Sequence, residues 1–311
     1  MYKRSILLIA TLIVASCAKQ ETQTTSTTAP EPPPVSTAST APAQPKDITE
    51  GLQTPESVLY DADQDVYFIS NINGQPLAAD NNGYVLRVNP DTLKADKWVE
   101  GGQNSVTLDA PKGMAIVGDT LYVSDITTVR KFDRKSGAPQ GEVRITGATF
   151  LNDLASDGKS VYVSDTGMKA GAGGNFEPTG SDAIWQIQGS SRFTLAADKD
   201  LNRPNGIDIV DGKVWVVTFG SNELYQIDKG KKTNVVKLPK GQLDGLAHLS
   251  DGTFLVSSWE ANAVYRGTAT GPFTAVIENV KSPADIGYDT KRKRLLVPHF
   301  TENKVTVHAL Q

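Results

Sequence analysis

Residues 203–219 read "RPNGIDIVDGKVWVVTF": a polar start, an apolar run, a short turn at Asp211-Gly212 and a second apolar run. Two apolar runs separated by such a turn are typical of a β-hairpin. Five further stretches have the same order, and they read "TPESVLYDADQDVYFIS" from Thr54, "APKGMAIVGDTLYVSD" from Ala110, "FLNDLASDGKSVYVSD" from Phe150, "QLDGLAHLSDGTFLVSSW" from Gln242 and "SPADIGYDTKRKRLLVPHF" from Ser282. The chain therefore contains six copies of one hairpin pattern.

The six copies repeat with a period near forty residues. Three of the five intervals between their matching first positions are 39 or 40 residues, and these positions are Glu56, Lys112, Asn152, Asn205, Asp244 and Ala284. Each copy continues into further strand-like text, such as "ELYQID" at 223–228, so we expect four antiparallel strands per repeat. Six such units around an axis predict an all-β fold, a six-bladed β-propeller over residues 50–311. The two longer intervals indicate insertions at 71–83 and 166–182.

The amino-terminal segment has the pattern of an export signal. Lys3-Arg4 precede an apolar run at 6–14 and small residues follow, which is typical of a secretory signal peptide over residues 1–16. The sequence Val14-Ala15-Ser16-Cys17 resembles the lipobox of bacterial lipoproteins, in which the cysteine becomes the acylated amino terminus. This resemblance predicts lipidation at Cys17, and Ala18 after it predicts an outer-membrane anchor facing the periplasm. An ordinary signal peptide with an incidental cysteine is the alternative.

Residues 17–49 are expected to form a disordered tether. They are rich in Thr, Pro and Ser and contain no aromatic residue, so they bury too little surface to offset the entropy of ordering. Cys17 is the only cysteine of the chain, which rules out an intrachain disulfide. The formal net charge of −4 gives no basis for nucleic-acid binding.

In a propeller blade, the start of the first strand and the end of the second strand lie at the same mouth of the disc. The expected strand-one starts are Glu56, Lys112, Asn152, Asn205 and Asp244, and the strand-two ends are Ser70, Asp125, Asp165, Thr218, Ser258 and His299. Three of them, Glu56, Asn205 and Asp244, offer oxygen ligands, which suit a hard cation, most naturally Ca²⁺, with Mg²⁺, Mn²⁺ or Zn²⁺ as alternatives. Taken singly, Asn or Asp before Gly is an ordinary turn residue. For Asp125 and Asp165 the sequence favours capping or turn hydrogen bonds, and for His299 it favours a packed or hydrogen-bonded ring over a catalytic one.

Several of these stretches together resemble one known family. The segments "PESVLYDADQDVYFISN", "FLNDLASDG", "RPNGIDI" and "LDGLAHLSDGTFLVSSW" are similar to successive blades of the gluconolactonase and regucalcin-like (senescence marker protein) propellers, over residues 52–311. The resemblance implies one divalent cation on Glu56, Asn205 and Asp244, with Asn152 facing the substrate or the metal. It also implies catalysis at Asp244 and Asn152: the cation polarises a lactone carbonyl, a metal-bound water attacks, and Asp244 accepts a proton.

The sequence departs from this family where a substrate would bind. Phe150 stands where the family often has an Arg that holds a sugar, Ser57-Val58 replaces Ser-Pro after Glu56, and Asp153-Leu154 replaces Asp-Gly. The residues therefore support a cation site better than a sugar-acid substrate, and fold membership alone does not fix function.

Two functions stay open on these grounds. The first is a lipid-anchored, periplasm-facing hydrolase that opens a lactone or ester in a pocket lined by Phe150, Lys112, Asn152, Asp165, Thr218, Ser258 and His299. The second is a non-catalytic propeller that binds a ligand or a protein and keeps the cation as a structural tie. A quinone-dependent oxidoreductase is less consistent with the sequence, because apart from Lys112 the mouth is acidic or neutral. The sequence has no Gly-x-Ser-x-Gly elbow, phosphate loop or zinc-type His/Cys spacing.

Overall fold

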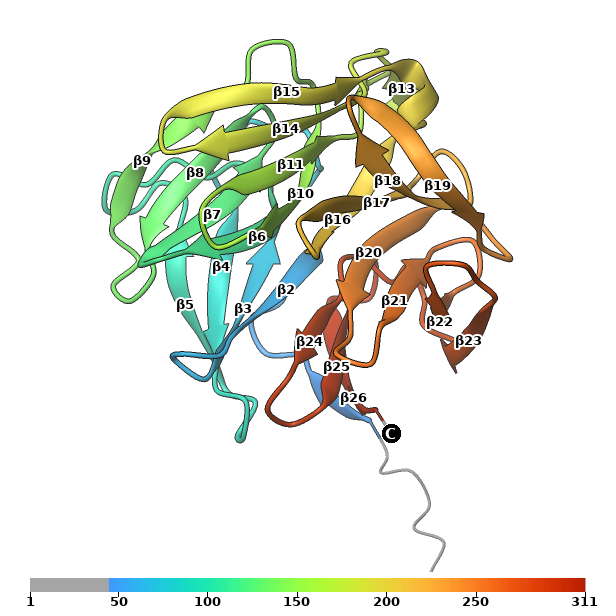
Figure 1. The fold of residues 1–311 in the computed structure, drawn as a ribbon. Helices are drawn as coiled ribbons and strands as arrows, with labels where there is room; N and C mark the ends of the chain where they lie inside the picture. The colour runs from blue at the N-terminus through green and yellow to red at the C-terminus, as the bar shows by residue number, and fades with distance from the viewer. Residues whose placement is uncertain (1–44, 311) are drawn as a thin grey trace, which may run out of the picture. The chain divides into compact units, whose positions relative to one another are not determined.

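The computed structural model describes residues 45–310. It contains six four-stranded antiparallel sheets around a central axis (Figure 1), which confirms the predicted six-bladed β-propeller. The signal segment, Cys17 and most of the expected tether lie outside the described residues. Within 45–310, no helix is long and apolar enough to cross a membrane.

Each sheet is one blade, and its strands follow one another in chain order. The first three blades are built from β2 (Pro55–Asp61), β3 (Val66–Asn71), β4 (Tyr84–Val88) and β5 (Ala95–Glu100); β6 (Pro111–Val117), β7 (Thr120–Asp125), β8 (Thr128–Asp133) and β9 (Pro139–Arg144); and β10 (Leu151–Ser156), β11 (Val161–Asp165), β14 (Ala183–Gln188) and β15 (Ser191–Ala197). Blades four and five are built from β16 (Pro204–Val210), β17 (Lys213–Thr218), β18 (Glu223–Asp228) and β19 (Lys231–Lys237); and β20 (Leu243–His248), β21 (Thr253–Ser258), β22 (Ala263–Thr268) and β23 (Phe273–Glu278).

Blade six joins the two ends of the described chain. It contains β24 (Gly287–Asp289), β25 (Arg294–His299) and β26 (Lys304–Ala309), and its outer strand is β1 (Lys46–Ile48), which pairs antiparallel with β26. The propeller therefore begins at Lys46, whereas the repeats had predicted a start at residue 50. The reason is that the last blade has only three strands of its own, and a fourth strand from the amino-terminal side covers the edge of β26.

Hydrophobic side chains fill the space between neighbouring blades. Six buried clusters occur, one at each of the six blade interfaces; for example, Phe68 and Val85 of blade one pack with Met114 and Leu121 of blade two. Every interface thus has its own apolar core. This explains how a disc whose described part contains no cysteine is held together.

The first strand of each of blades one to five contains the same irregularity. In blade four, Pro204 pairs with Thr218 but Ile207 pairs with Val216, so the first strand has one extra residue, and the same shift recurs in β2, β6, β10 and β20. Such a β-bulge turns a side chain out of the regular alternation of a strand. The bulge spans the matching first positions of the sequence repeat, Glu56, Lys112, Asn152, Asn205 and Asp244.

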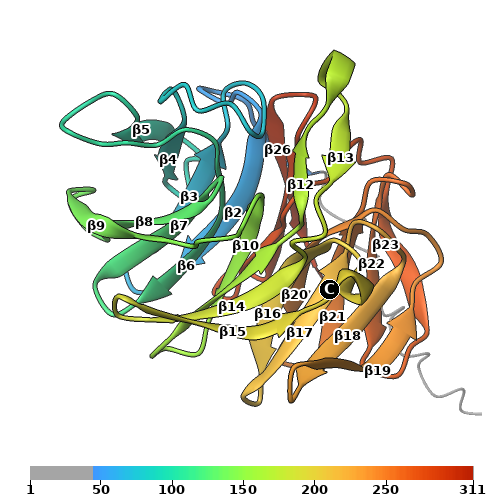
Figure 2. The ribbon, with the colours of Figure 1, turned by 90° about the horizontal axis from the view of Figure 1, so that it is seen from above.

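Blade three contains an additional hairpin. Strands β12 (Met168–Ala170) and β13 (Phe176–Pro178) pair with each other between β11 and β14, and the 3₁₀ turn η1 (Ala172–Gly174) joins them. This hairpin lies within the predicted insertion at 166–182. Figure 2 shows it projecting from one face of the disc.

Candidate functional site

A cavity of about 540 Å³ opens at one mouth of the propeller and is called the mouth cavity here. Its floor consists of the second residue of the first strand in blades one to five, namely Glu56, Lys112, Asn152, Asn205 and Asp244. These polar side chains are at most 6% exposed. The sequence repeat therefore brings together in space the five residues that it aligned.

Four floor oxygens lack a hydrogen-bond partner although they are buried. They are Oε2 of Glu56 and the Oδ1 atoms of Asn152, Asn205 and Asp244. Only two further side-chain atoms of the described residues are buried without a partner, and neither residue lines this cavity. A buried oxygen without a donor is costly, by about 1–3 kcal/mol. Four such atoms on one floor make this cavity the candidate binding site among the described residues.

The two amides present their oxygens to the cavity because their nitrogens are held elsewhere. Nδ2 of Asn152 donates to Oγ1 of Thr166 at 3.1 Å, and Nδ2 of Asn205 donates to the carbonyl of Leu243 at 3.4 Å. Reversing either amide would turn an NH₂ group into the cavity and place an oxygen against an acceptor. The hydrogen bonds thus fix which atom of each amide is available to a ligand.

Burial dominates the electrostatics of the two floor carboxylates. It raises the pKa of Asp244 to about 8, with a further contribution from the negative charge of Asp285, while the hydrogen bond from Trp259 acts in the opposite direction. Burial also raises the pKa of Glu56, helped by the charges of Asp244 and Asp285. The charge of Asp244 also helps to raise the pKa of Glu56, and a proton or a cation near the two carboxylates would relieve this repulsion.

Among the described residues that line the mouth cavity, Lys112 is the only basic one. Its Nζ donates to the carbonyl of Ala110 at 2.9 Å and lies 4.7 Å from the ring centroid of Phe150. Burial lowers its pKa to about 8, although the charges of Glu56 and Asp125 oppose this. Only one of its N–H donors is used within the described chain, so the ammonium can donate to a molecule in the cavity.

The backbone that carries the floor residues is held by serines that the sequence reasoning missed. Ser164 Oγ accepts from the N–H of Asp153 at 3.0 Å and donates to the carbonyl of Asn205 in the next blade at 2.6 Å. Ser124 donates in the same way to the carbonyl of Asn152, and Ser257 to that of Ala284. The recurring Ser before the last residue of the second strand in "YVSD" and "VSS" was the available signal.

Four residues expected in the pocket do not line the mouth cavity: Asp165, Thr218, Ser258 and His299. They are buried and hold nearby loops instead. Asp165 accepts from the N–H groups of Thr149, Phe150 and Gly167, and Ser258 donates to Gly241. Thr218 bonds Ser221, and the His299 ring nitrogens lie 3.0 Å from Glu302 and Thr306.

The residue after each of these four lines the cavity in their place. Thr166, Phe219, Trp259 and Phe300 all contribute to its wall. Each of them is the first residue after the second strand of its blade, whereas the last residue of that strand bonds the nearby loops. The expected register was therefore one residue early at the strand-two ends, and it hid the aromatic character of the site.

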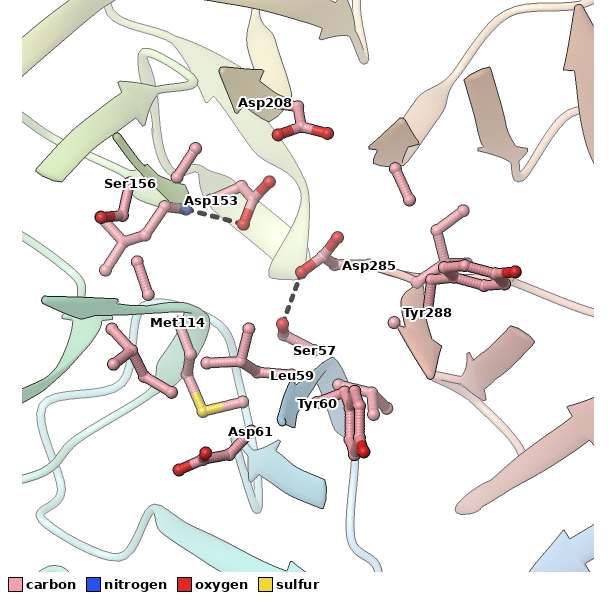
Figure 3. Close-up of a pocket in the computed structure, with 18 of the residues that line it drawn as sticks. Ser57, Leu59, Tyr60, Asp61, Met114, Asp153, Ser156, Asp208, Asp285 and Tyr288 are labelled. Carbon is pink, nitrogen blue, oxygen red and sulfur yellow. Dashed lines mark hydrogen bonds between the residues drawn. The ribbon is translucent and has the colours of Figure 1, made fainter. Parts of the chain in front are cut away.

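A second cavity, of about 550 Å³, lies around the opposite ends of the first strands (Figure 3). Asp153, Asp208 and Asp285 point into it, but each accepts hydrogen bonds from the protein: Asp285 from Ser57, Asp153 from the N–H of Ile207, and Asp208 from the N–H of His248. None of the unpartnered buried atoms of residues 45–310 belongs to this cavity. The mouth cavity is therefore the better candidate for a ligand.

The chemistry of the floor fits a hard divalent cation. Within the described residues, no three His, Cys, Asp or Glu side chains are grouped so that they could hold a metal. The floor instead combines two carboxylates with two amide oxygens, a set typical of oxygen-ligated Ca²⁺. All four groups have an oxygen that the protein leaves without a donor. The predicted ligands Glu56, Asn205 and Asp244 are among them, and Asn152 joins the set.

No protein-family model and no curated protein matches the sequence. Solved structures match its fold. A gluconolactonase from Xanthomonas campestris matches with a TM-score of 0.65 at 17% identity over 86% of this chain and 91% of that one. A luciferin-regenerating enzyme matches with a TM-score of 0.63 at 12% identity, over 86% of this chain and 96% of that one. A chain of a nidogen/laminin complex matches with a TM-score of 0.59 at 16% identity, over 75% of this chain and 88% of that one. At such identities the likeness establishes the propeller fold alone.

Proposed function

We propose that the mouth cavity binds one divalent cation, most naturally Ca²⁺, and hydrolyses a lactone or ester. The observation that carries this proposal is the set of four buried, unpartnered oxygens on Glu56, Asn152, Asn205 and Asp244. The gluconolactonase of the same fold adds support, as does the resemblance of the blade sequences to that family. Attachment to the bacterial outer membrane through Cys17 is part of the same proposal.

The cation, when bound, would polarise a carbonyl and make a nearby water more acidic. The chain's own residues do the rest. Trp259 Nε1 donates to Oδ2 of Asp244 at 2.7 Å, which orients the carboxylate and leaves Oδ1 toward the cavity as ligand and proton acceptor. Asn152 holds its fixed amide oxygen toward the cavity, where it faces the cation or the substrate. The Lys112 ammonium stabilises negative charge that develops on the substrate oxygen in the transition state.

A non-catalytic scaffold is the second candidate. The chain in the nidogen/laminin complex has the same fold, and a cation on the floor would tie blades one, three, four and five together even without chemistry. The two functions make different predictions, because a structural cation has no effect on a carbonyl compound.

The test is a combined binding and turnover experiment on the full-length protein. We expect one Ca²⁺ per chain by calorimetry and chelator-sensitive hydrolysis on a panel of lactones and aryl esters. Asn205→Ala and Asp244→Ala should each weaken Ca²⁺ binding by at least about 100-fold. Loss of a residue that only supports a metal ligand already costs up to about 100-fold, and these two residues are proposed ligands themselves. Asp200→Ala, at an exposed position away from the cavity, is the matched control.

Three outcomes would count against the proposal. Bound Ca²⁺ with no turnover on any lactone or ester would favour the scaffold. Turnover indifferent to chelator and to both substitutions would exclude the cation from the reaction. Failure to bind any divalent cation would remove the proposed role of the four floor oxygens.

A further inference from the structure

The wall of the mouth cavity is aromatic. Five rings contribute to it, here called the aromatic wall: Phe150, Phe176, Phe219, Trp259 and Phe300. Three of these residues directly follow the second strands of blades four, five and six, so the same repeat that places the floor also places the wall.

The five rings contact one another in two groups, one of three rings and one of two. The ring centroids of Phe219 and Trp259 are 5.8 Å apart, and those of Trp259 and Phe300 are 5.2 Å apart. On the other side of the cavity Phe176, on strand β13 of the projecting hairpin, meets Phe150 edge to face at 6.1 Å. Phe176 is 40% exposed, and the other four rings are partly exposed. An apolar surface of this kind is stabilised when a ligand covers it.

Three of the polar side chains that line the cavity, Thr166, Thr301 and Asn303, are hydrogen-bonded to the protein. Thr166 Oγ1 donates to the carbonyl of Pro204 and accepts from Asn152. Thr301 bonds Ser282, and Asn303 Oδ1 accepts from the N–H of Thr54. A sugar lactone would bring several hydroxyl groups against this wall, and a buried hydroxyl without a partner is unfavourable. The wall therefore disfavours a polyhydroxylated ligand.

The wall is also joined to the floor. Trp259 stacks in the wall and donates its Nε1 hydrogen to Asp244. A molecule whose carbonyl lies over the floor oxygens would thus place its remaining atoms against the rings. The cavity of about 540 Å³ is large enough for a small molecule of this kind.

We propose that the substrate is a lactone or ester with an apolar remainder, an aryl group or a medium-length alkyl chain, and that the aromatic wall selects it over sugar lactones. This inference rests on the proposed hydrolytic function. It goes further because it assigns the choice of substrate to Phe219, Trp259 and Phe300. None of these three was among the residues that the sequence predicted to line the pocket.

The experiment compares two lactones and one inert analogue on the full-length protein with Ca²⁺ present. The lactones are a δ-lactone with a six-carbon alkyl chain and glucono-δ-lactone. The analogue is the cyclic ether with the same alkyl chain, which cannot be hydrolysed and whose binding is followed by tryptophan fluorescence. We expect kcat/KM for the alkyl lactone to exceed that for glucono-δ-lactone by about 100-fold or more.

Alanine variants of the aromatic wall test whether its rings contact the substrate. Phe219→Ala and Phe300→Ala should each raise KM for the alkyl lactone and weaken binding of the ether by about tenfold, because each removes a ring from the contact. Both variants should leave Ca²⁺ affinity unchanged, which shows that the floor is intact. Phe193→Ala, at an exposed position on β15 away from the cavity, should change none of these values.

The outcomes separate this inference from the proposed function. Faster turnover of glucono-δ-lactone than of the alkyl lactone would overturn the inference and leave hydrolysis standing. Binding of the ether without turnover of either lactone would support the apolar ligand and overturn hydrolysis. Absence of ether binding, or binding that both wall variants leave unchanged, would overturn the inference.

Discussion

Lys112 places a positive charge on the same floor as the oxygens that would hold a cation. It lies close enough to Glu56 for the two charges to influence each other's pKa, yet no ion pair within 4 Å forms between them among the described residues. A bound divalent cation would therefore be repelled by the ammonium. In the proposed function, Lys112 would therefore weaken cation binding while it provides a hydrogen-bond donor to the substrate.

Replacing this lysine should make the cation bind more tightly. We expect Lys112→Met to raise Ca²⁺ affinity by about tenfold, because methionine fills a similar volume without the charge and a tenfold change needs only about 1.4 kcal/mol. The same variant should lower kcat for the preferred lactone, since the donor to the substrate oxygen is lost. Calorimetry and steady-state kinetics measure the two effects.

Lys159→Met, in an exposed turn between β10 and β11, is the control and should change neither quantity. Unchanged or weaker Ca²⁺ binding in Lys112→Met would contradict a shared electrostatic site.

At the level of residues, the sequence predicts the floor better than the wall. The repeat aligns Glu56, Asn205 and Asp244, and because equal repeat positions occupy equal places in a ring, alignment implies proximity. The same reasoning came within one residue of Trp259. It predicted that Ser258, the last residue of β21, lines the cavity, but the residue that does so is Trp259, which follows it. The hydrogen-bonding states of the floor oxygens have no signal in the sequence.

The bulge in the first strand and the serine in the second strand work together as one element. Ser164 Oγ bonds one backbone group in each of two neighbouring bulges: it accepts from the N–H of Asp153 in blade three and donates to the carbonyl of Asn205 in blade four. The hydroxyl therefore links the bulge of blade three to that of blade four. It holds the backbone that carries the Asn205 side chain.

Removing that hydroxyl should affect both stability and the cation site. We expect Ser164→Ala to lower the free energy of unfolding by about 1–3 kcal/mol, because a buried N–H and a carbonyl lose their partner. Ca²⁺ affinity should fall several-fold as Asn205 is released. Urea denaturation and calorimetry provide the two measurements, with Ser191→Ala, exposed at the start of β15, as the control.

A drop in stability with unchanged Ca²⁺ affinity would mean that Ser164 supports the fold and not the position of Asn205. No drop at all would show that the bulge is held by other contacts.

The hairpins themselves were predictable, whereas the bulges and β1 were not. Alternating apolar residues around a turn such as Asp211-Gly212 specify the inner two strands of a blade directly. A bulge changes pairing without changing that alternation. Strand β1 is only Lys46–Ile48, too short for a pattern and preceded by polar text, and it becomes a strand because β26 offers an unpaired edge.

On the scale of the whole molecule, the ring is held by six separate apolar interfaces and by one strand that joins its ends. Ile48 of β1 is 2% exposed and belongs to the cluster between blades six and one. The closure thus combines backbone pairing with apolar burial at a single interface.

Removal of β1 should measurably weaken the disc. A chain that starts at residue 49 should unfold at a lower urea concentration than one that starts at residue 45, with a loss of about 2 kcal/mol or more from the burial of Ile48 alone. The far-ultraviolet spectrum should stay that of a β protein, since five blades are untouched. Equal midpoints for the two chains would show that β26 does not need its outer neighbour.

The pairing of β1 with β26 also leads to an expectation about the order in which the blades form during folding. Lys46 pairs with Val307, so the two partners are separated by nearly the entire described sequence, while every other blade is assembled from neighbouring segments. Contacts between distant segments form slowly, yet the entropic cost of closing a loop grows only logarithmically with its length. Blade six is therefore expected to be the last to mature during refolding, with a delay of kinetic origin and little penalty in final stability.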